Sequence, residues 1–172
     1  MELDEHHNAQ QPKERPTFLT VLLVMSSISI GLSILSTLSG LVSGPMDAAS
    51  IEQFTAEQYE AVGELKNLGM EDVSEMIASM MELTIYQSQN NYYLFQLVNL
   101  LTLFVGAYGI FLMFKLKKLG FHLYVAYSLL PIIWFYVFVP SELIPNFLIF
   151  GSLFLSALFI ILYAVHLKKM EG

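Results

Sequence analysis

Four long apolar stretches dominate this chain and limit the folds that it can adopt. They cover residues 17–43, 92–114, 121–139 and 147–165, and none of them contains Asp, Glu, Lys or Arg. Each is close to the roughly 20 residues that a helix needs to cross the hydrocarbon core of a bilayer. They lack the alternation of apolar and polar residues that is typical of strands in membrane barrels. The sequence therefore predicts an all-α integral membrane protein with four transmembrane helices.

The basic residues predict how these helices are oriented. Seven of the eight Lys and Arg residues flank the apolar stretches, at positions 13, 15, 115, 117, 118, 168 and 169. With an even number of spans, these seven all fall on one side of the membrane. Basic loops are retained in the cytoplasm. We therefore expect both termini to be cytoplasmic, in a multi-pass protein of the plasma membrane.

The segment between the first and second spans, residues 45–90, predicts a folded insertion outside the cytoplasm. It holds nine acidic residues and a single basic one, Lys66. Thr55 to Gln58 fits a capping box, which predicts an amphipathic helix from Thr55 to Gly69. Glu71 and Asp72 then suit the start of a second helix, because carboxylates are stabilised at a helix N-terminus. The expected element is an amphipathic helical hairpin.

Two features of this hairpin stay open at the level of sequence. No proline or glycine interrupts the chain from residue 71 to Gly106, so the second helix is able to continue into the second span as one rod. The hairpin is either a lid on the outer ends of the spans or a surface that binds a partner. In the second case its exposed acidic face would consist of Glu57, Glu60 and Glu64, which recur at helical spacing.

The domain organisation follows from these segments. We expect a polar, disordered tail at residues 1–16 and a single four-helix membrane domain at residues 17–172, which includes the insertion. The chain has no cysteine, which excludes disulfides, thiol chemistry and thiolate metal ligands.

Small and polar residues mark one flank of each of the first two spans. In span one they are Ser33, Ser36 and Gly40, and in span two they are Gln96, Asn99, Thr102 and Gly106. Small residues three or four apart let helix backbones approach closely in a membrane. We expect these flanks to meet, within one subunit or between two copies. The amides either bond across the helices or line a polar path.

The chemistry of the chain predicts no enzyme. The spans contain no Asp, Glu, Lys or Arg, the residue types that a proton-coupled transporter would need within the membrane. We find no metalloprotease, serine hydrolase or phosphate-binding motif. We therefore expect no catalytic residue, no metal ligand and no cofactor.

The basic clusters are explained by topology, so no nucleic acid is expected as a partner. The expected partners are the lipid bilayer and either another protein or a second copy.

Residues 115–127, with the sequence KLKKLGFHLYVAY, carry a resemblance. This segment resembles a turn in uncharacterised small four-span membrane proteins of bacteria. The resemblance implies a bacterial inner membrane and no particular activity.

Two functional hypotheses remain. The first is an accessory or interaction subunit of a membrane assembly. The second is an oligomeric passive pore or transport component lined by Gln96, Asn99 and Thr102.

Overall fold

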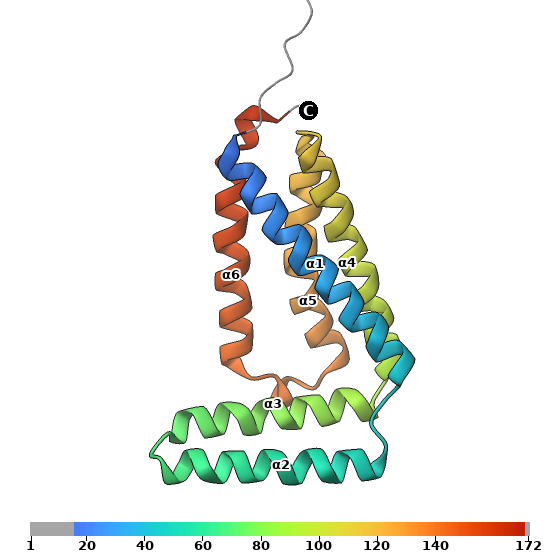
Figure 1. The fold of residues 1–172 in the computed structure, drawn as a ribbon, viewed down its shortest axis with the longest axis vertical. Helices are drawn as coiled ribbons and strands as arrows, with labels where there is room; N and C mark the ends of the chain where they lie inside the picture. The colour runs from blue at the N-terminus through green and yellow to red at the C-terminus, as the bar shows by residue number, and fades with distance from the viewer. Residues whose placement is uncertain (1–15, 171–172) are drawn as a thin grey trace, which may run out of the picture.

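The computed structural model describes residues 16–170 and shows a helical protein (Figure 1). The tail expected at residues 1–16 lies outside the described residues, apart from Pro16. Short 3₁₀ turns at Ser141–Leu143 and Leu167–Lys169 come before and after the last helix. In chain order the α-helices are α1 Thr17–Ser43, α2 Ala48–Asn67, α3 Glu71–Gln89, α4 Tyr92–Phe114, α5 Lys118–Phe138 and α6 Asn146–Ala164.

Four of these helices, α1, α4, α5 and α6, are long and apolar enough to cross a membrane. The first two begin and end at the residues predicted from the apolar stretches, and the last two lie within a few residues of them. The prediction of an all-helical chain with four long apolar helices is confirmed. Helix α5 continues through Pro131, which lies in its second half.

The closest packing in the bundle is between α4 and α5. Their backbones approach through Gly109 and Gly120, since a side-chain carbon added at Gly120 would stand 2.5 Å from the carbonyl oxygen of Gly109. Helix α1 crosses α4 obliquely (Figure 1) and buries Leu23 and Ile30 there. Helix α6 packs chiefly on α5, and its Tyr163 reaches the same buried cluster. The core therefore lies where α1, α4 and α5 meet, and α6 lies at its edge.

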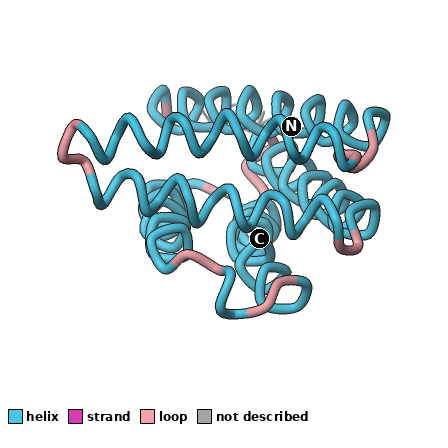
Figure 2. The backbone as a smooth tube through the Cα atoms, turned by 90° about the horizontal axis from the view of Figure 1, so that it is seen from below, coloured by secondary structure: helices cyan, strands magenta, loops and turns pink. Residues whose placement is uncertain are grey.

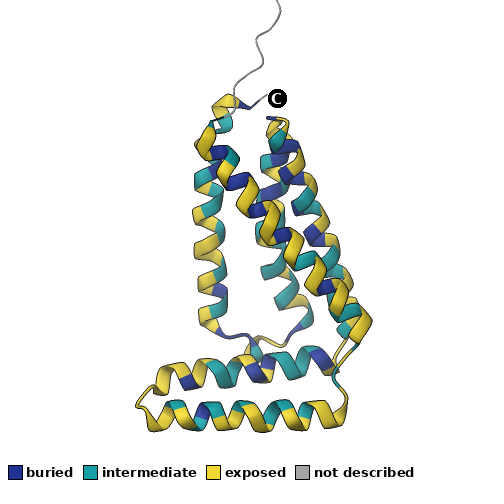
Figure 3. Ribbon diagram, in the orientation of Figure 1, coloured by how far each residue is buried: buried dark blue, intermediate teal, exposed yellow. Residues whose placement is uncertain are grey.

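The hairpin of α2 and α3 lies across one end of the bundle. Figures 1 and 2 show the two helices side by side and roughly perpendicular to α5 and α6, whereas α1 runs obliquely to them. Helix α3 rests on the bundle through Leu83, which is buried against Val139 and Ile144 at the connection between α5 and α6. Helix α2 packs on α3 and is held away from the bundle, and its outward side is exposed (Figure 3).

The predicted start of the first hairpin helix, at Thr55, is wrong. Helix α2 begins at Ala48, and Asp47 caps it by accepting a hydrogen bond of 2.8 Å from the backbone N–H of Ser50. Hydrogen bonds from the side chain and backbone of Ser50 hold the pKa of Asp47 below its usual value. Asp47 is the first favourable N-cap residue after Pro45. No helix-breaking residue lies between Asp47 and Thr55, so the helix continues through this segment. Thr55 therefore lies inside α2.

The single rod from α3 into α4 does not form. Helix α3 ends at Gln89, and Asn91 adopts a left-handed conformation with φ 53°. Asparagine tolerates this conformation better than most residues because its short amide bonds locally. Here the Nδ2 of Asn90 donates to the carbonyl of Tyr86 at 3.0 Å. The pair Asn90 and Asn91 thus turns the chain from the hairpin into α4.

Candidate functional site

The polar flank of α4 packs against α1 at the end of the bundle nearest the hairpin. A side-chain carbon added at Gly40 would stand 2.8 Å from the amide nitrogen of Gln96, so Gly40 makes room for that side chain. The hydroxyl of Tyr92 donates to the carbonyl of Gly40 at 2.8 Å. The absence of a side chain at Gly40 therefore allows two polar groups of α4 to reach α1.

Asn99 and Thr102 use their polar groups between helices. The Nδ2 of Asn99 donates to the hydroxyl of Thr37 on α1 at 3.2 Å. The indole N–H of Trp134 on α5 donates to the hydroxyl of Thr102, also at 3.2 Å. Thr37 and Thr102 are both buried. A cavity of about 170 Å³ remains beside Asn99 and Thr102, and most of its lining is aromatic or aliphatic. We name the contact that Thr37, Asn99, Thr102 and Trp134 form the α1–α4–α5 seam.

The other predicted packing residues are distributed unevenly around this seam. Gly106 is buried, and a carbon added there would stand 2.6 Å from the ring of Tyr127. Ser33 is half-buried, and its carbonyl accepts a hydrogen bond from Thr37. Ser36 is exposed and takes no part in the seam. The buried side of α1 is therefore displaced by about one residue from the flank that Ser33, Ser36 and Gly40 mark. Thr37 is buried, whereas its neighbour Ser36 is exposed.

The hydrogen bond between Asn99 and Thr37 makes a testable contribution to stability. We expect Asn99→Leu and Thr37→Val to destabilise the protein individually, and the double variant to lose less than their sum. The expected coupling free energy is about 0.6 kcal/mol, the average for such bonds in membrane proteins. Reversible unfolding in mixed micelles measures it. Strictly additive losses would contradict the bond, and pairing Asn99→Leu with Ser36→Ala is the control, since Ser36 is exposed.

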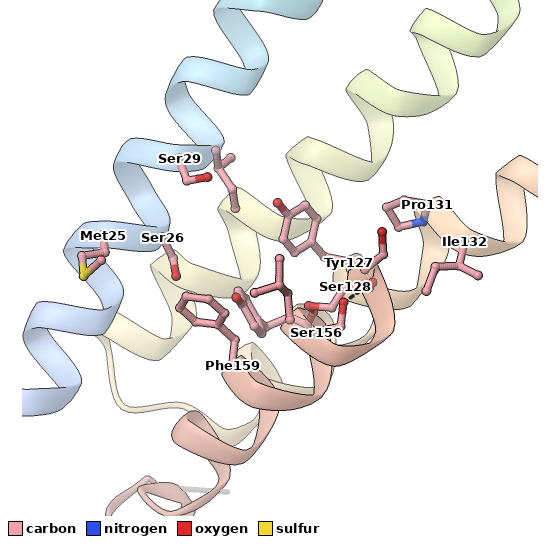
Figure 4. Close-up of a pocket in the computed structure, with 13 residues that line it drawn as sticks. Met25, Ser26, Ser29, Tyr127, Ser128, Pro131, Ile132, Ser156 and Phe159 are labelled. Carbon is pink, nitrogen blue, oxygen red and sulfur yellow. Dashed lines mark hydrogen bonds between the residues drawn. The ribbon is translucent and has the colours of Figure 1, made fainter. Parts of the chain in front are cut away.

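A larger cavity of about 510 Å³ lies between α1, α5 and α6 (Figure 4). Ser26 and Ser29 reach it from α1, Tyr124, Tyr127 and Ser128 from α5, and Ser152 and Ser156 from α6. We name it the hydroxyl cavity. The residues predicted for the flank of span one, Ser33, Ser36 and Gly40, do not line this cavity.

The contributions of α5 and α6 were not predicted as site residues. A signal for them exists in the sequence: Tyr124 and Ser128, and likewise Ser152 and Ser156, are polar residues four apart in otherwise apolar helices. Residues at this spacing share one helix face. Which faces converge depends on how α5 and α6 are rotated, and the sequence does not show this.

The histidines and acidic residues that the structure describes do not form a metal site. Within residues 16–170, no three His, Cys, Asp or Glu side chains lie close enough together to hold a metal ion. The imidazole of His122 lies 3.0 Å from the carbonyl of Lys118 in its own helix. The ring of His166 stacks on Phe18, with 5.7 Å between the ring centres. Each of these histidines therefore has a local neighbour that accounts for its position.

Comparison with known families places the chain. Residues 13–167 match the family model described as "Domain of unknown function (DUF8777)". The chain belongs to this family. The match covers all four long apolar helices and the hairpin, so these elements together form the unit that family members share. No curated protein and no solved structure matches the chain. The structural features that bear on function are the seam, the hydroxyl cavity and the hairpin.

Proposed function

We propose that this protein is a non-catalytic multi-pass membrane protein that serves as an accessory or interaction subunit of a membrane assembly. The observation that carries the proposal is the position of α2. Helix α3 lies between α2 and the bundle, so the outer side of α2 is free to meet another protein. Glu57, Glu60 and Glu64 are all exposed on α2.

The charge of this surface defines the chemistry of the partner. Glu60 and Glu64 form no hydrogen bond or ion pair with other described residues, and Glu57 accepts one bond of 2.8 Å from Gln53. Carboxylates without a neutralising cation attract a basic partner and repel an acidic one. The proposed partner is therefore a protein that presents Lys or Arg residues at the level of the hairpin.

The membrane and topology belong to the same proposal. We place the protein in the plasma membrane, in a bacterial inner membrane, with both termini in the cytoplasm and the hairpin outside. The exposed residues Lys115, Lys117 and Lys118 at the connection between α4 and α5 support this orientation, because basic loops stay in the cytoplasm. The acidic α2 lies at the opposite end of the bundle.

The alternative of a passive pore has less support. A pore lined by α4 needs its polar groups to face water. Asn99 bonds to Thr37, and Thr102 accepts from Trp134, so both side chains already have protein partners. A pore through several copies would have to break these bonds or use another face.

The docking proposal predicts the behaviour of a charge variant. Changing Glu57, Glu60 and Glu64 together to Gln should leave the fold intact, because these side chains are exposed. Partner recovery from native membranes should fall several-fold and become less sensitive to salt, because surface charges act through complementarity and steering. Quantitative mass spectrometry of proteins that co-purify at low and high salt measures both effects.

A matched variant separates the specific surface from the overall charge. Glu71, Glu75 and Glu82 on α3 are also exposed, and changing them to Gln alters the net charge by the same amount. If α2 is the docking surface, this second variant should keep most of the partner. If the original protein and both triple variants recovered equal amounts of partner, the docking proposal would be wrong and the hairpin would be interpreted as a lid.

A further inference from the structure

The hydroxyl cavity lies near the middle of the three helices that line it. Its residues fall at 25–30 of α1, 124–132 of α5 and 152–159 of α6, well away from the helix ends. Met25 and Leu155, which belong to its lining, are exposed by 57% and 55%. The cavity therefore opens on the side of the bundle between α1 and α6. In a membrane this opening faces the hydrocarbon chains of the lipids.

Some of the hydroxyls in the cavity already have protein partners. Ser26 and Tyr163 share a hydrogen bond of 2.8 Å between their hydroxyls. Ser128 donates to the carbonyl of Tyr124 at 2.9 Å. Ser156 donates to the carbonyl of Ser128 at 3.1 Å, which connects α6 to α5 (Figure 4). The bonds of Ser26 and Ser156 connect different helices and so join the walls of the cavity.

Other hydroxyls in the cavity are left without partners. Ser29, Ser152 and Tyr127 form no side-chain hydrogen bond with the described residues. Figure 4 shows Ser29 and Tyr127 reaching into the space between α1 and α5. A hydroxyl that faces hydrocarbon without a partner costs free energy. An occupant that can donate and accept hydrogen bonds would remove this cost.

The walls also define the size and charge of the occupant. A volume of about 510 Å³ lies in the range of small-molecule sites and is too small for a further helix. No charged side chain among residues 16–170 lines the cavity, so an ionised group inside it would find no partner there. Ile30, Ile132 and Phe159 provide an apolar wall for a hydrocarbon body. The headgroup of an ordinary phospholipid stays at the membrane surface, too far away to reach hydroxyls at this depth.

We propose that the hydroxyl cavity is a binding site for a small, neutral amphiphile from the membrane, one that carries a hydroxyl or carbonyl group on an apolar body. Its polar group bonds to Tyr127, Ser29 and Ser152, and its apolar body lies along Ile30, Ile132 and Phe159. The molecule enters sideways from the lipid between α1 and α6. This site is separate from the acidic face of α2. The proposal for the cavity therefore does not depend on the docking proposal.

A photoreactive probe tests the site in the full-length protein in phosphatidylcholine nanodiscs. The probe is 1-decanol that carries a diazirine in its chain, with decane and decanoic acid carrying the same group as comparisons. We expect saturable labelling by the alcohol, mapped to the cavity segments of α1, α5 and α6 and displaced by unlabelled 1-decanol. The alkane and the acid should label these segments weakly, because one lacks the hydroxyl and the other adds a charge.

Two kinds of variant separate binding from folding. Tyr127→Phe keeps the ring and removes the hydroxyl, so the alcohol should bind about fivefold more weakly, the effect of losing one ordinary hydrogen bond. Ser152→Phe should fill the cavity and abolish the saturable labelling. The matched control is Gly151→Phe, since a side-chain carbon at exposed Gly151 meets nothing within 4 Å. That variant should label like the original protein.

Several results would overturn the proposal. Equal labelling by the alkane and the alcohol would show that the hydroxyls are not used. Labelling that does not saturate, or that spreads over all lipid-facing residues, would show that no site exists. If Tyr127→Phe, with an unchanged melting temperature, bound the alcohol as well as the original protein does, the assigned contact would be wrong. Cross-links between two copies at Ser29 and Ser152, in place of probe labelling, would show that a second copy occupies the cavity.

Discussion

Replacing Gly120 with Ala should lower the free energy of unfolding by about 3 kcal/mol and reduce the melting temperature in detergent markedly. The new carbon would stand 2.5 Å from the carbonyl oxygen of Gly109 and 2.6 Å from the backbone nitrogen of Met113. Both atoms belong to the backbone of α4, so a change of side-chain rotamer cannot relieve the clash. The two helices must separate, and the closest contact of the bundle opens.

Gly151→Ala provides the matched control for this prediction. Gly151 lies on α6 and is exposed, and a carbon added there has no neighbour within 4 Å. The chemical change is the same, and alanine favours a helix in both places. We expect Gly151→Ala to leave the melting temperature unchanged or slightly raised. Similar melting temperatures for the two variants would show that α4 and α5 are not in backbone contact.

Labelling of single cysteines should give an all-or-none pattern that reports the topology. A cysteine that replaces Ser50 on α2 should react with an impermeant maleimide in intact cells, whereas one that replaces Lys117 should react only after the membrane is permeabilised. Both residues are exposed, and the chain has no cysteine of its own to react in the background. The reason is the positive charge at the connection between α4 and α5, which favours retention in the cytoplasm.

Additional positions make the labelling result decisive. Cysteine at Ser79 on α3 should label like that at Ser50, and cysteine at Ala9, outside the described residues, should label like that at Lys117. Cysteine at exposed Val42 near the end of α1 should react slowly, since water-borne reagents reach the hydrocarbon region poorly. The reverse pattern would place the acidic hairpin in the cytoplasm, and the proposed docking partner would then have to be cytoplasmic.

The lengths of the apolar helices could be predicted closely from the sequence. Helices α1 and α4 begin and end at the predicted residues because their apolar stretches are bounded by proline, glycine, asparagine or lysine. A backbone in hydrocarbon must satisfy its own hydrogen bonds, so a charge-free stretch of this length has few alternatives to a helix. The existence of a helical hairpin between them was likewise predictable from its amphipathic pattern.

The bounds within the hairpin were harder to predict because local signals competed. Thr55 has the pattern of a cap, but Asp47 supplies a cap eight residues upstream, about two turns earlier, and the longer helix gains hydrogen bonds at no steric cost. Asn90 and Asn91 end the helix without proline or glycine. Asparagine pairs are a weaker turn signal than glycine, so the sequence left both a break and a continuous rod open.

The sequence by itself determined which segments are helices and, to within a few residues, where the long ones begin and end. Only the tertiary structure decided how each helix is rotated. Serines lie on several sides of α1, yet Ser26 and Thr37 are buried while Ser36 is exposed. In water a hydrophobic stripe sets the rotation of a helix, but helices that are apolar all round carry no such stripe. Close contacts such as Gly109 with Gly120 set the rotation instead, and they bring the hydroxyls of α1, α5 and α6 into one cavity.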